Sequence, residues 1–543
     1  MSTDTIPQSL RFIAILRGLS AISLSWLVQS VTQHWPGYYD VKPINVKSVW
    51  NLLNTSPVYN KFRDLIYPKS VDFPRHKFTT LPLDIVLEIV KELDWRSVLT
   101  IRRTCKYLEE ISRTRIVWCS QYRRYVAQRT FPLYLEEPLE SYSAAELERW
   151  VLLRISADLG WNSRDTKLTR IHRFKQKVVT GIFLVPGGRW LLAGLEDGTV
   201  LAYDLDAATI TPKPLIQPKA KQHPVYYMSM SRDLSSPNLT FTLSLSPCLQ
   251  SDSSPPLIVN IWRVTLVGHG ATAQLTATPL KIFHAHDIGS IGMTAMLGNL
   301  LGRSMRNDEG ISYIDIFDWA KSTSEAHCKA TIFPNEIIDA IRFLPDGRLL
   351  ACSAKSFAIY PCVIAEGLQV TAPIAIPKVT EPLWKLPFNG VRILHGALSD
   401  GYSDALATYF VVSAGNLIYG LSVPRSVDQS PHLCELMEVD GLQPGHITLA
   451  VRSEKVLIQH RDRSIYRLVF SWAARGVKDP QPFQTYSSVT WNDFPTTCNG
   501  ARLPLLDEET GRIIQSARDG IVVVDTALLY MYTLDKMEEL STQ

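Results

Sequence analysis

The 543-residue sequence has no excess of either charge, because 56 lysines and arginines face 52 aspartates and glutamates, which leaves a net charge of +4. A protein that binds nucleic acid in general would carry a stronger basic balance, so no nucleic-acid partner is expected. The eight cysteines are scattered, and no Cys-x-x-Cys pair occurs. This spacing predicts no disulfide framework and favours reduced thiols in an intracellular compartment, the cytoplasm or the nucleus.

Motifs for nucleotide binding and covalent catalysis are also missing. The sequence contains no GxxxxGK[ST] phosphate loop and no GxGxxG between a strand and a helix. It contains no GxSxG nucleophile elbow either. We therefore expect a non-catalytic protein with no cofactor.

The only candidate for a metal site is the pair His284 and His286, which alternation along a strand would place on one face. The third potential ligand, Asp287, would point to the other face. Two histidines alone make a poor zinc site, so structural histidines are expected here and no metal is predicted.

Long hydrophobic runs are rare, and the most apolar stretch extends from Leu10 to Val31. Arg17 interrupts it and leaves eleven uncharged apolar or small residues up to Val28, fewer than the roughly 20 needed to cross a bilayer. No clear signal-peptide cleavage site follows. We expect an amphipathic helix or an extension without its own fold. Membrane attachment through this segment is the alternative. Residues 33–77 have no sustained period and are expected to form a loosely structured lead-in.

A compact helical stretch extends from Phe78 to Tyr125. Pro82 suits the first position of a helix, and Asp84 places a carboxylate near the positive end of the helix dipole. Asp94 can cap a second helix, from Trp95 to about Arg103. Apolar spacing predicts three short helices. The residues expected inside are Ile85, Val86, Ile89, Val90 and Leu93, then Val98, Leu99 and Ile101, then Leu108, Ile111 and Val117.

This stretch resembles the F-box, the helical module by which substrate receptors of cullin-RING ubiquitin ligases bind the Skp adaptor. The resemblance rests on Leu81, Pro82, Asp84, Ile85, Leu87, Ile89, Leu93, Leu99, Arg102, Cys105, Lys106, Leu108, Ile111 and Trp118. It implies docking on the Skp adaptor and, through it, on a cullin. The adaptor-binding residues that it implies are Leu81, Pro82, Ile85, Leu87, Ile89, Leu93 and Leu99. The alternative is a small helical packing unit without a partner.

Basic residues gather in the second half of the same stretch. They are Arg102, Arg103, Lys106, Arg113, Arg115, Arg123 and Arg124, against only Glu109 and Glu110. Such a run is usually a solvated face. Within an F-box it would also steer an acidic adaptor surface toward the module.

A linker helix is predicted after an extended connector that contains Pro132 and Pro138. Ser143 and Glu146 form a capping-box pattern at its start, and Gly160 is placed to end it. Its apolar residues are Leu147, Val151, Ile155 and Leu159. Trp161 is expected to pack against the next domain.

From about Thr166 the sequence changes to short β-type runs separated by turns. The clearest unit is Ile182–Asp204, which predicts three strands joined by a Pro-Gly-Gly and a Glu-Asp-Gly turn, and Ile341–Tyr360 repeats it. A strand-end motif occurs seven times, at intervals of 43 to 59 residues. The seven copies end at Asp204, Arg263, Asp318, Pro361, Gly420, Arg467 and Asp525. They resemble degenerate WD repeats and imply a β-propeller of about seven blades.

Closure of that ring has two candidate strands. Residues 168–174 can add an outer strand to the last blade, and residues 527–533 compete for the same place. The predicted fold class is therefore multidomain, α plus all-β: a three-helix F-box, a linker helix and a propeller. The predicted domains are an extension (1–77), the F-box (78–125), the linker (126–165) and the propeller (166–543).

These features together indicate the substrate-recognition subunit of a Skp-cullin-F-box ubiquitin ligase, whose propeller binds a protein substrate for ubiquitin-dependent degradation. The alternative is an intracellular propeller scaffold for protein–protein interactions with no role in a ubiquitin ligase.

Overall fold

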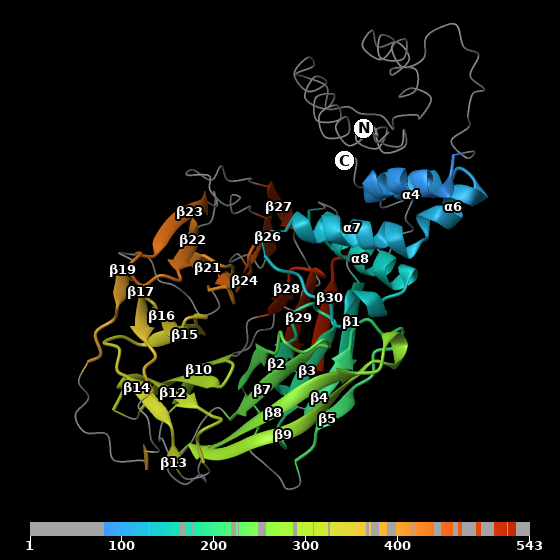
Figure 1. The fold of residues 1–543 in the computed structure, drawn as a ribbon. Coiled ribbons are helices and arrows are strands. Elements are labelled where there is room, and N and C mark those ends of the chain that lie inside the picture. Colours follow the sequence, from blue (N-terminus) through green and yellow to red (C-terminus); the bar gives the residue numbers. More distant parts are fainter. Residues whose placement is uncertain are drawn as a thin grey trace, which may run out of the picture. The chain divides into compact units, whose positions relative to one another are not determined.

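The computed structural model describes residues 81–129, 131–162, 170–175, 179–218, 224–225, 227–247, 257–285, 290–307, 309–323, 326–364, 369–370, 379–387, 398–414, 417–438, 447–459, 465–469, 485–489, 504–517 and 520–527. Every helix and strand below belongs to one compact unit, which begins at Pro82 (Figure 1). The apolar stretch Leu10–Val31 and the lead-in 33–77 lie outside the described residues. Among the described helices, none is long and apolar enough to cross a membrane.

The helical stretch contains four helices where the sequence predicted three. They are α4 (Leu83–Glu92), α5 (Trp95–Arg102), α6 (Lys106–Ser112) and α7 (Arg115–Ala127). The predicted third helix is divided because the backbone is extended at Thr114, which starts α7 as its N-cap. The carbonyl groups at the end of α6 find other donors there: Thr114 donates to the Ile111 carbonyl, and the indole of Trp118 donates to the Ser112 carbonyl at 2.9 Å.

The caps and buried residues of these helices agree largely with those predicted from the sequence. Asp94 caps α5 by accepting from the Ser97 N–H at 2.8 Å. Pro82 is the N-cap of α4, one residue before the position predicted for it. Seven of the predicted inward residues are buried, namely Val86, Val90, Val98, Leu99, Leu108, Ile111 and Val117. Ile85, Leu93 and Ile101 are half-buried, and Ile89 is exposed.

The linker helix is α8 (Ala144–Asn162), preceded by a 3-10 turn at Leu139–Ser141. Its capping box is present, because the Glu146 carboxylate accepts from the Ser143 N–H at 2.8 Å and the Ser143 hydroxyl accepts from the Glu146 N–H at 3.3 Å. The helix does not end at Gly160, as predicted, but continues to Asn162. The Gly160 carbonyl accepts from Arg467 at 2.9 Å, and Trp161 is fully buried, so contacts with the strands hold this last turn in place.

The described strands form seven four-stranded antiparallel sheets and one two-stranded pair. In chain order, the four-stranded sheets are β2 (Val179–Leu184), β3 (Trp190–Leu195), β4 (Val200–Asp204), β5 (Lys213–Ile216); β6 (Tyr227–Arg232), β7 (Thr240–Ser246), β8 (Leu257–Val267), β9 (Gln274–Ala285); β10 (Ser290–Leu297), β11 (Leu300–Arg306), β12 (Ser312–Asp318), β14 (Lys329–Ile332); β15 (Ile338–Phe343), β16 (Arg348–Ser353), β17 (Ser356–Pro361), β19 (Trp384–Pro387); β20 (Tyr402–Ser403), β21 (Ala407–Ala414), β22 (Leu417–Pro424), β23 (His432–Glu438); β24 (Ile447–Val451), β25 (Lys455–Gln459), β26 (Ile465–Val469), β27 (Thr485–Val489); and β28 (Leu505–Asp507), β29 (Arg512–Ala517), β30 (Gly520–Asp525), β1 (Arg170–Lys175). The pair is β13 (Ala326–His327) with β18 (Gln369–Val370).

All seven motifs lie in the third strand of a four-stranded sheet, in β4, β8, β12, β17, β22, β26 and β30, but only those in β4, β12, β17 and β30 end their strand as predicted. The motifs in β8, β22 and β26 lie in the middle or at the start of the strand. Hydrophobic clusters fill the space between neighbouring sheets. One joins β2–β5 to β6–β9 through Trp190 and Phe241, and another joins β15–β19 to β20–β23 through Phe357 and Phe410. The last sheet packs on the first, because Ile514 and Val523 share a cluster with Leu191 and Tyr203.

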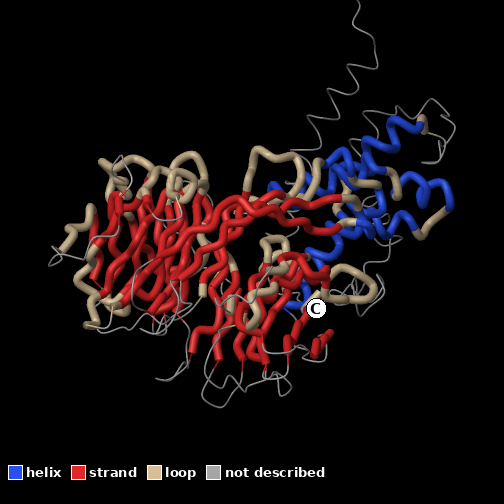
Figure 2. Tube along the Cα trace, turned by 90° about the horizontal axis from the view of Figure 1, so that it is seen from below, coloured by secondary structure: helices blue, strands red, loops and turns tan. Residues whose placement is uncertain are grey.

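The strand β1 pairs with β30, with Arg170 opposite Asp525 and Phe174 opposite Ile521. The outer strand is therefore supplied by residues 170–175, which overlap the first of the two predicted closing segments, 168–174. Ala527 is buried against Leu153 and Ala157 of α8, and residues 528–533 lie outside the described residues. The last sheet thus combines strands from both ends of the strand-rich region, which hides two sheet edges. Figure 2 shows the helices gathered at one side of the strands.

Candidate docking surface

Helix α4 carries apolar side chains that its own module does not cover. Val86 and Val90 are fully buried, and two pairs with a spacing of four residues flank them. Leu83 (51% exposed) and Leu87 lie on one side, and Ile85 and Ile89 (38% exposed) lie on the other. We call these four residues, together with the exposed N-cap Pro82, the α4 surface. Sequence reasoning missed Leu83, although its spacing of four residues from Leu87 was a usable signal.

Three of the predicted adaptor-binding residues lie outside the α4 surface. Leu99 is 3% exposed and belongs to the core of the helical module. Its neighbours Val98 and Leu108 are buried as well, which is why the apolar pattern of α5 did not distinguish core from interface. Leu93 is half-buried at the end of α4, and Leu81 is half-buried just before Pro82.

Helix α7 braces the end of α4. The Gln121 amide donates to the Leu93 carbonyl at 2.8 Å, and Arg124 donates to the same carbonyl. The Ser120 hydroxyl donates to the Lys91 carbonyl at 3.1 Å. These bonds satisfy carbonyls that a helix end otherwise leaves without partners. The α4 surface is therefore presented on a helix whose position is fixed.

The basic run does not form one open surface. Arg102 makes a bidentate contact with Glu148 at 2.6 and 2.9 Å, and its side chain is 10% exposed. Arg115 donates to the carbonyls of Leu139 and Tyr142 at 2.7 and 2.9 Å. These two arginines and Arg124 hold the helical module together. Arg103, Lys106, Arg113, Arg115 and Arg123 are the exposed members, and of these Arg115 is tied to the carbonyls of Leu139 and Tyr142.

Polar contacts join the C-terminal half of α8 to two neighbouring sheets. Asp158 binds the Lys455 ammonium at 2.9 Å and also pairs with Arg129. Burial raises the pKa of the Asp158 carboxyl, but these two cations outweigh it and hold that pKa below its usual range. Trp161 is fully buried, with the Lys455 ammonium 5.4 Å from its ring centroid. The prediction that Trp161 packs on the next domain is thereby confirmed.

The turn between β28 and β29 supplies two acidic residues to the same joint. Glu509 pairs with Arg154 of α8 at 3.0 Å. Glu508 accepts from the backbone N–H groups of Ser453 and Glu454, at 3.3 and 3.0 Å. Burial raises the pKa of both carboxyl groups to about 7, against the opposing effect of nearby arginine and lysine cations.

All of these contacts lie at one end of the sheets. Turns that contact the helical module follow β6, β24, β28 and β8. The first three of these strands are the first strand of their sheet, in the order given above, and β8 is the third strand of its sheet. Successive antiparallel strands reverse direction, so such turns share one end of a sheet. The helical module occupies that end, and the turns after second strands lie at the opposite end. At that opposite end, Ser246 and Asn260 line a pocket with room for about one water molecule. The Ser246 hydroxyl and the side-chain amide oxygen of Asn260 have no partner in the described residues.

No group of three metal-ligating side chains occurs among the described residues. His284 lies in β9, and His286 and Asp287 fall outside the described part of the chain.

Comparisons with known proteins identify similar structures but no family. The sequence matches no family model. No curated protein matches it. Among solved structures, the chain is similar to U3-55K, with 11% identity over 66% of this chain and 99% of that one and a TM-score of 0.39. It is also similar to the β-propeller domain of Cps50 (Swd1) from Myceliophteria thermophila, with 11% identity over 65% and 99% of the two chains and a TM-score of 0.40.

Proposed function

We propose that this chain is a non-catalytic receptor of a Skp-cullin-F-box ubiquitin ligase, with α4 docking on the Skp adaptor and the sheets binding a protein substrate. The observation that carries the proposal is the α4 surface. Leu83 and Ile89 expose apolar area on the two sides of the packed face of α4, and α7 holds the end of that helix in place. Burial of such residues in a partner's groove is the usual source of affinity when an amphipathic helix docks. The resemblance of this stretch to the F-box supplies the identity of the partner.

The seven four-stranded sheets are, in this proposal, the blades of one closed propeller. First strands contact one another in sequence order, as in the pairs β2 with β6, β6 with β10 and β10 with β15. The strand β28 contacts β2, which links the last sheet to the first. Arg512 strengthens this closure. It is fully buried, pairs with Asp525 at 2.7 Å and donates to the Gly188 carbonyl, in the turn between β2 and β3, at 2.7 Å.

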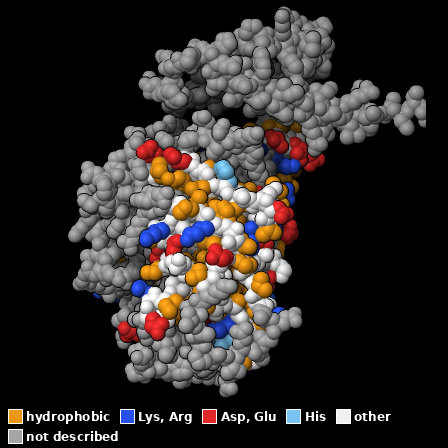
Figure 3. Space-filling view, turned by 90° about the vertical axis from the view of Figure 1, so that its left-hand side faces the viewer, with side chains coloured by type: hydrophobic (Ala, Val, Ile, Leu, Met, Phe, Trp, Pro, Cys, Tyr) orange, Lys and Arg blue, Asp and Glu red, His pale blue; other side chains and the backbone are white. Residues whose placement is uncertain are grey.

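Substrate would bind at the end of the sheets away from the helices. The helical module already occupies the turns at the other end, and the two unpartnered polar atoms of Ser246 and Asn260 lie at the free end. On the face drawn in Figure 3, basic and acidic side chains are interspersed among hydrophobic ones.

The mechanism is proximity. A receptor that holds a target lysine close to a charged ubiquitin carrier raises the effective concentration of the two reacting groups, and it need not break a bond itself. The joint between α8 and the sheets is useful for this purpose, because a fixed joint gives the bound substrate a defined position relative to the adaptor.

The test is binding of the purified full-length chain to the purified Skp adaptor by calorimetry. We expect the paired substitution Leu83→Glu and Ile89→Glu to weaken binding at least about a hundredfold, because two charges would enter an apolar groove. The matched control is Leu406→Glu, at a residue 73% exposed in the turn between β20 and β21, which should bind like the unchanged chain. Equal binding by all three proteins would overturn the docking assignment.

The second candidate is an intracellular scaffold whose helices pack on its own sheets and bind no adaptor. The observation in its favour is the number of ion pairs that hold α8 to the sheets, among them Asp158 with Lys455. Absence of adaptor binding by the unchanged, folded chain would favour this function over the first.

A further inference from the structure

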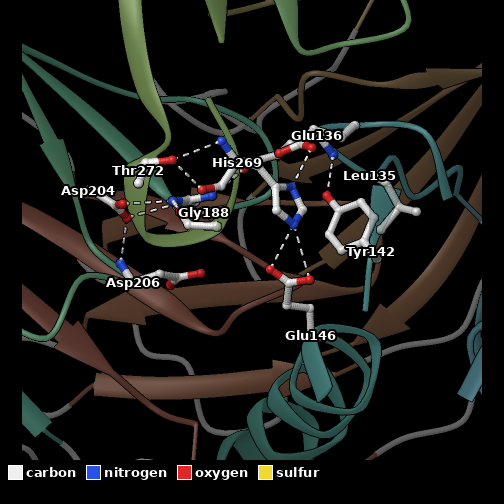
Figure 4. A network of polar contacts seen from close by, with 12 residues as sticks. Leu135, Glu136, Tyr142, Glu146, Gly188, Asp204, Asp206, His269 and Thr272 are labelled. Atoms are coloured by element: carbon white, nitrogen blue, oxygen red, sulfur yellow. Dashed lines mark hydrogen bonds and ion pairs between the residues drawn. The ribbon is translucent and has the colours of Figure 1, made fainter. Parts of the chain in front are cut away.

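The hairpin of β8 and β9 differs from the outer parts of the other sheets. Its strands have 11 and 12 residues, whereas the outer strands β5, β14 and β19 have four each. The extra length carries its tip, residues 268–273, to the end of the sheets that holds the helical module. There the tip contacts the connector and the first turn of α8 (Figure 4).

His269, at this tip, lies between two carboxylates from different segments. Its Nδ1 is 2.6 Å from the Glu137 carboxylate of the connector, and its Nε2 is 3.0 Å from the Glu146 carboxylate of α8. A neutral imidazole has one donor nitrogen, whereas the imidazolium has two. The geometry therefore fits the charged ring. Hydrogen bonding to Glu137, and then to Glu146, raises the pKa of His269.

Other groups around His269 complete the site. The Tyr142 ring lies edge-on to the imidazole, with centroids 6.1 Å apart. Arg189 is the nearby cation, and it donates to the Gly270 carbonyl at 2.9 Å while pairing with Glu136 at 2.8 Å and with Asp204 at 2.8 Å. The imidazole thus faces acceptors from the connector and α8, and Arg189 binds the neighbouring backbone without neutralising either acceptor.

Glu146 has two roles at once. The Glu146 carboxylate that contacts His269 also caps α8, because it accepts from the Ser143 N–H at 2.8 Å and from the Ser143 hydroxyl at 2.7 Å. The backbone conformation and this close approach both favour glycine at the next position of the tip. Gly270 has φ +56°, and a Cβ there would lie 3.0 Å from the Glu146 carboxylate.

We propose that the tip of the β8–β9 hairpin is a proton-dependent clasp, in which charged His269 holds the connector and the start of α8 against the sheets. When the ring loses its proton, one carboxylate faces a nitrogen lone pair in place of an N–H. The tip then holds the connector less tightly, because among the described residues only Arg189 still joins the Gly270 carbonyl to Glu136, while the joint at the other end of α8 is unchanged. This inference is independent of the adaptor, because every contact in it is within the chain.

Hydrogen exchange of the full-length chain tests the clasp, with rates corrected for the intrinsic effect of pH. Between pH 6 and pH 8.5 we expect protection of residues 131–147 to fall about two- to fivefold, the range that exposed ion pairs supply. His269→Gln should show the low protection at both pH values. His432→Gln, at an exposed histidine in β23, should behave like the unchanged chain.

Two further measurements keep the result interpretable. Protection of β3 serves as an internal reference, since a general loss there would mean that the variant is unfolded. Gly270→Ala keeps the imidazole but displaces the tip, and it should lower protection of residues 131–147 at pH 6. Unchanged protection across the pH range in the unchanged chain, or equal protection in His269→Gln at pH 6, would overturn the proposal.

Discussion

Arg154 and Glu509 form an ion pair at 3.0 Å although they are 355 residues apart in the chain and their side chains are only 6% and 11% exposed. The arginine belongs to α8 and the glutamate to the turn between β28 and β29. The guanidinium also lies 3.5 Å from the centroid of the Trp150 ring, on its own helix. Because both charges are largely removed from water, each depends on the other for its stability in the fold.

Loss of Arg154 should be strongly destabilising. We expect Arg154→Ala to lower the free energy of unfolding by about 3 kcal/mol, since it leaves Glu509 buried without its partner and removes the contact with Trp150. The double variant Arg154→Met with Glu509→Gln should lose much less. Urea unfolding of both proteins measures the difference, and equal losses would show that the pair itself is not the cause.

Stability should depend on pH through Glu508 and Glu509. Their pKa in the folded chain is about 7, above the value near 4.3 of an unfolded glutamate. The folded state therefore binds more protons, and its stability is greatest at low pH and falls as pH rises from about 4.5 to 7. Glu508→Gln should remove part of this slope and raise the free energy of unfolding at pH 8 by roughly 2 kcal/mol. Denaturation measured across this range would contradict the prediction if the variant kept the full slope.

Leu99 and Ile89 should separate stability from docking. Leu99 is 3% exposed and Ile89 is 38% exposed, so Leu99→Ala is expected to lower the free energy of unfolding by about 3 kcal/mol and Ile89→Ala by less than about 1 kcal/mol. The order should reverse for adaptor affinity in protein that remains folded. Thermal unfolding and calorimetry on the same preparations check both statements. If Leu99→Ala lowered adaptor affinity more than Ile89→Ala did, Leu99 would have to contact the adaptor.

Adjacent glycines in the turn between β2 and β3 offer a matched comparison. Both have positive φ, +98° at Gly187 and +71° at Gly188, but only Gly188 is crowded, because a Cβ at that position would overlap the Thr510 hydroxyl of the last sheet. Gly187→Ala should cost about 1 kcal/mol from backbone conformation alone. Gly188→Ala should cost at least about 2 kcal/mol more, because it pushes the first and last sheets apart. Similar melting temperatures for the two variants would show that this contact does not help to close the sheets.

Features that depend on a few neighbouring residues were predictable. The Ser143–Glu146 capping box and the Asp94 cap form within one turn of helix, so their residue types are sufficient to locate them. The seven strand-end motifs lie in third strands because alternation and turn residues specify a hairpin locally. The extra helix break at Thr114 was missed, since it depends on the Trp118 indole reaching back to Ser112.

The sequence by itself located the helical stretch, the linker helix and the third strands, because these depend largely on hydrogen bonds and side-chain spacing between near neighbours; it did not locate the break at Thr114 or the end of α8. The tertiary structure decided which of the apolar and charged residues remain available. It buried Leu99, left Leu83 exposed, and used Arg102 and Arg154 inside the chain. It also brought His269 to Glu137 and Glu146. These outcomes depend on how different segments pack together, 46 residues apart for Arg102 and Glu148 and 355 residues apart for Arg154 and Glu509, and no local pattern of residues records that packing.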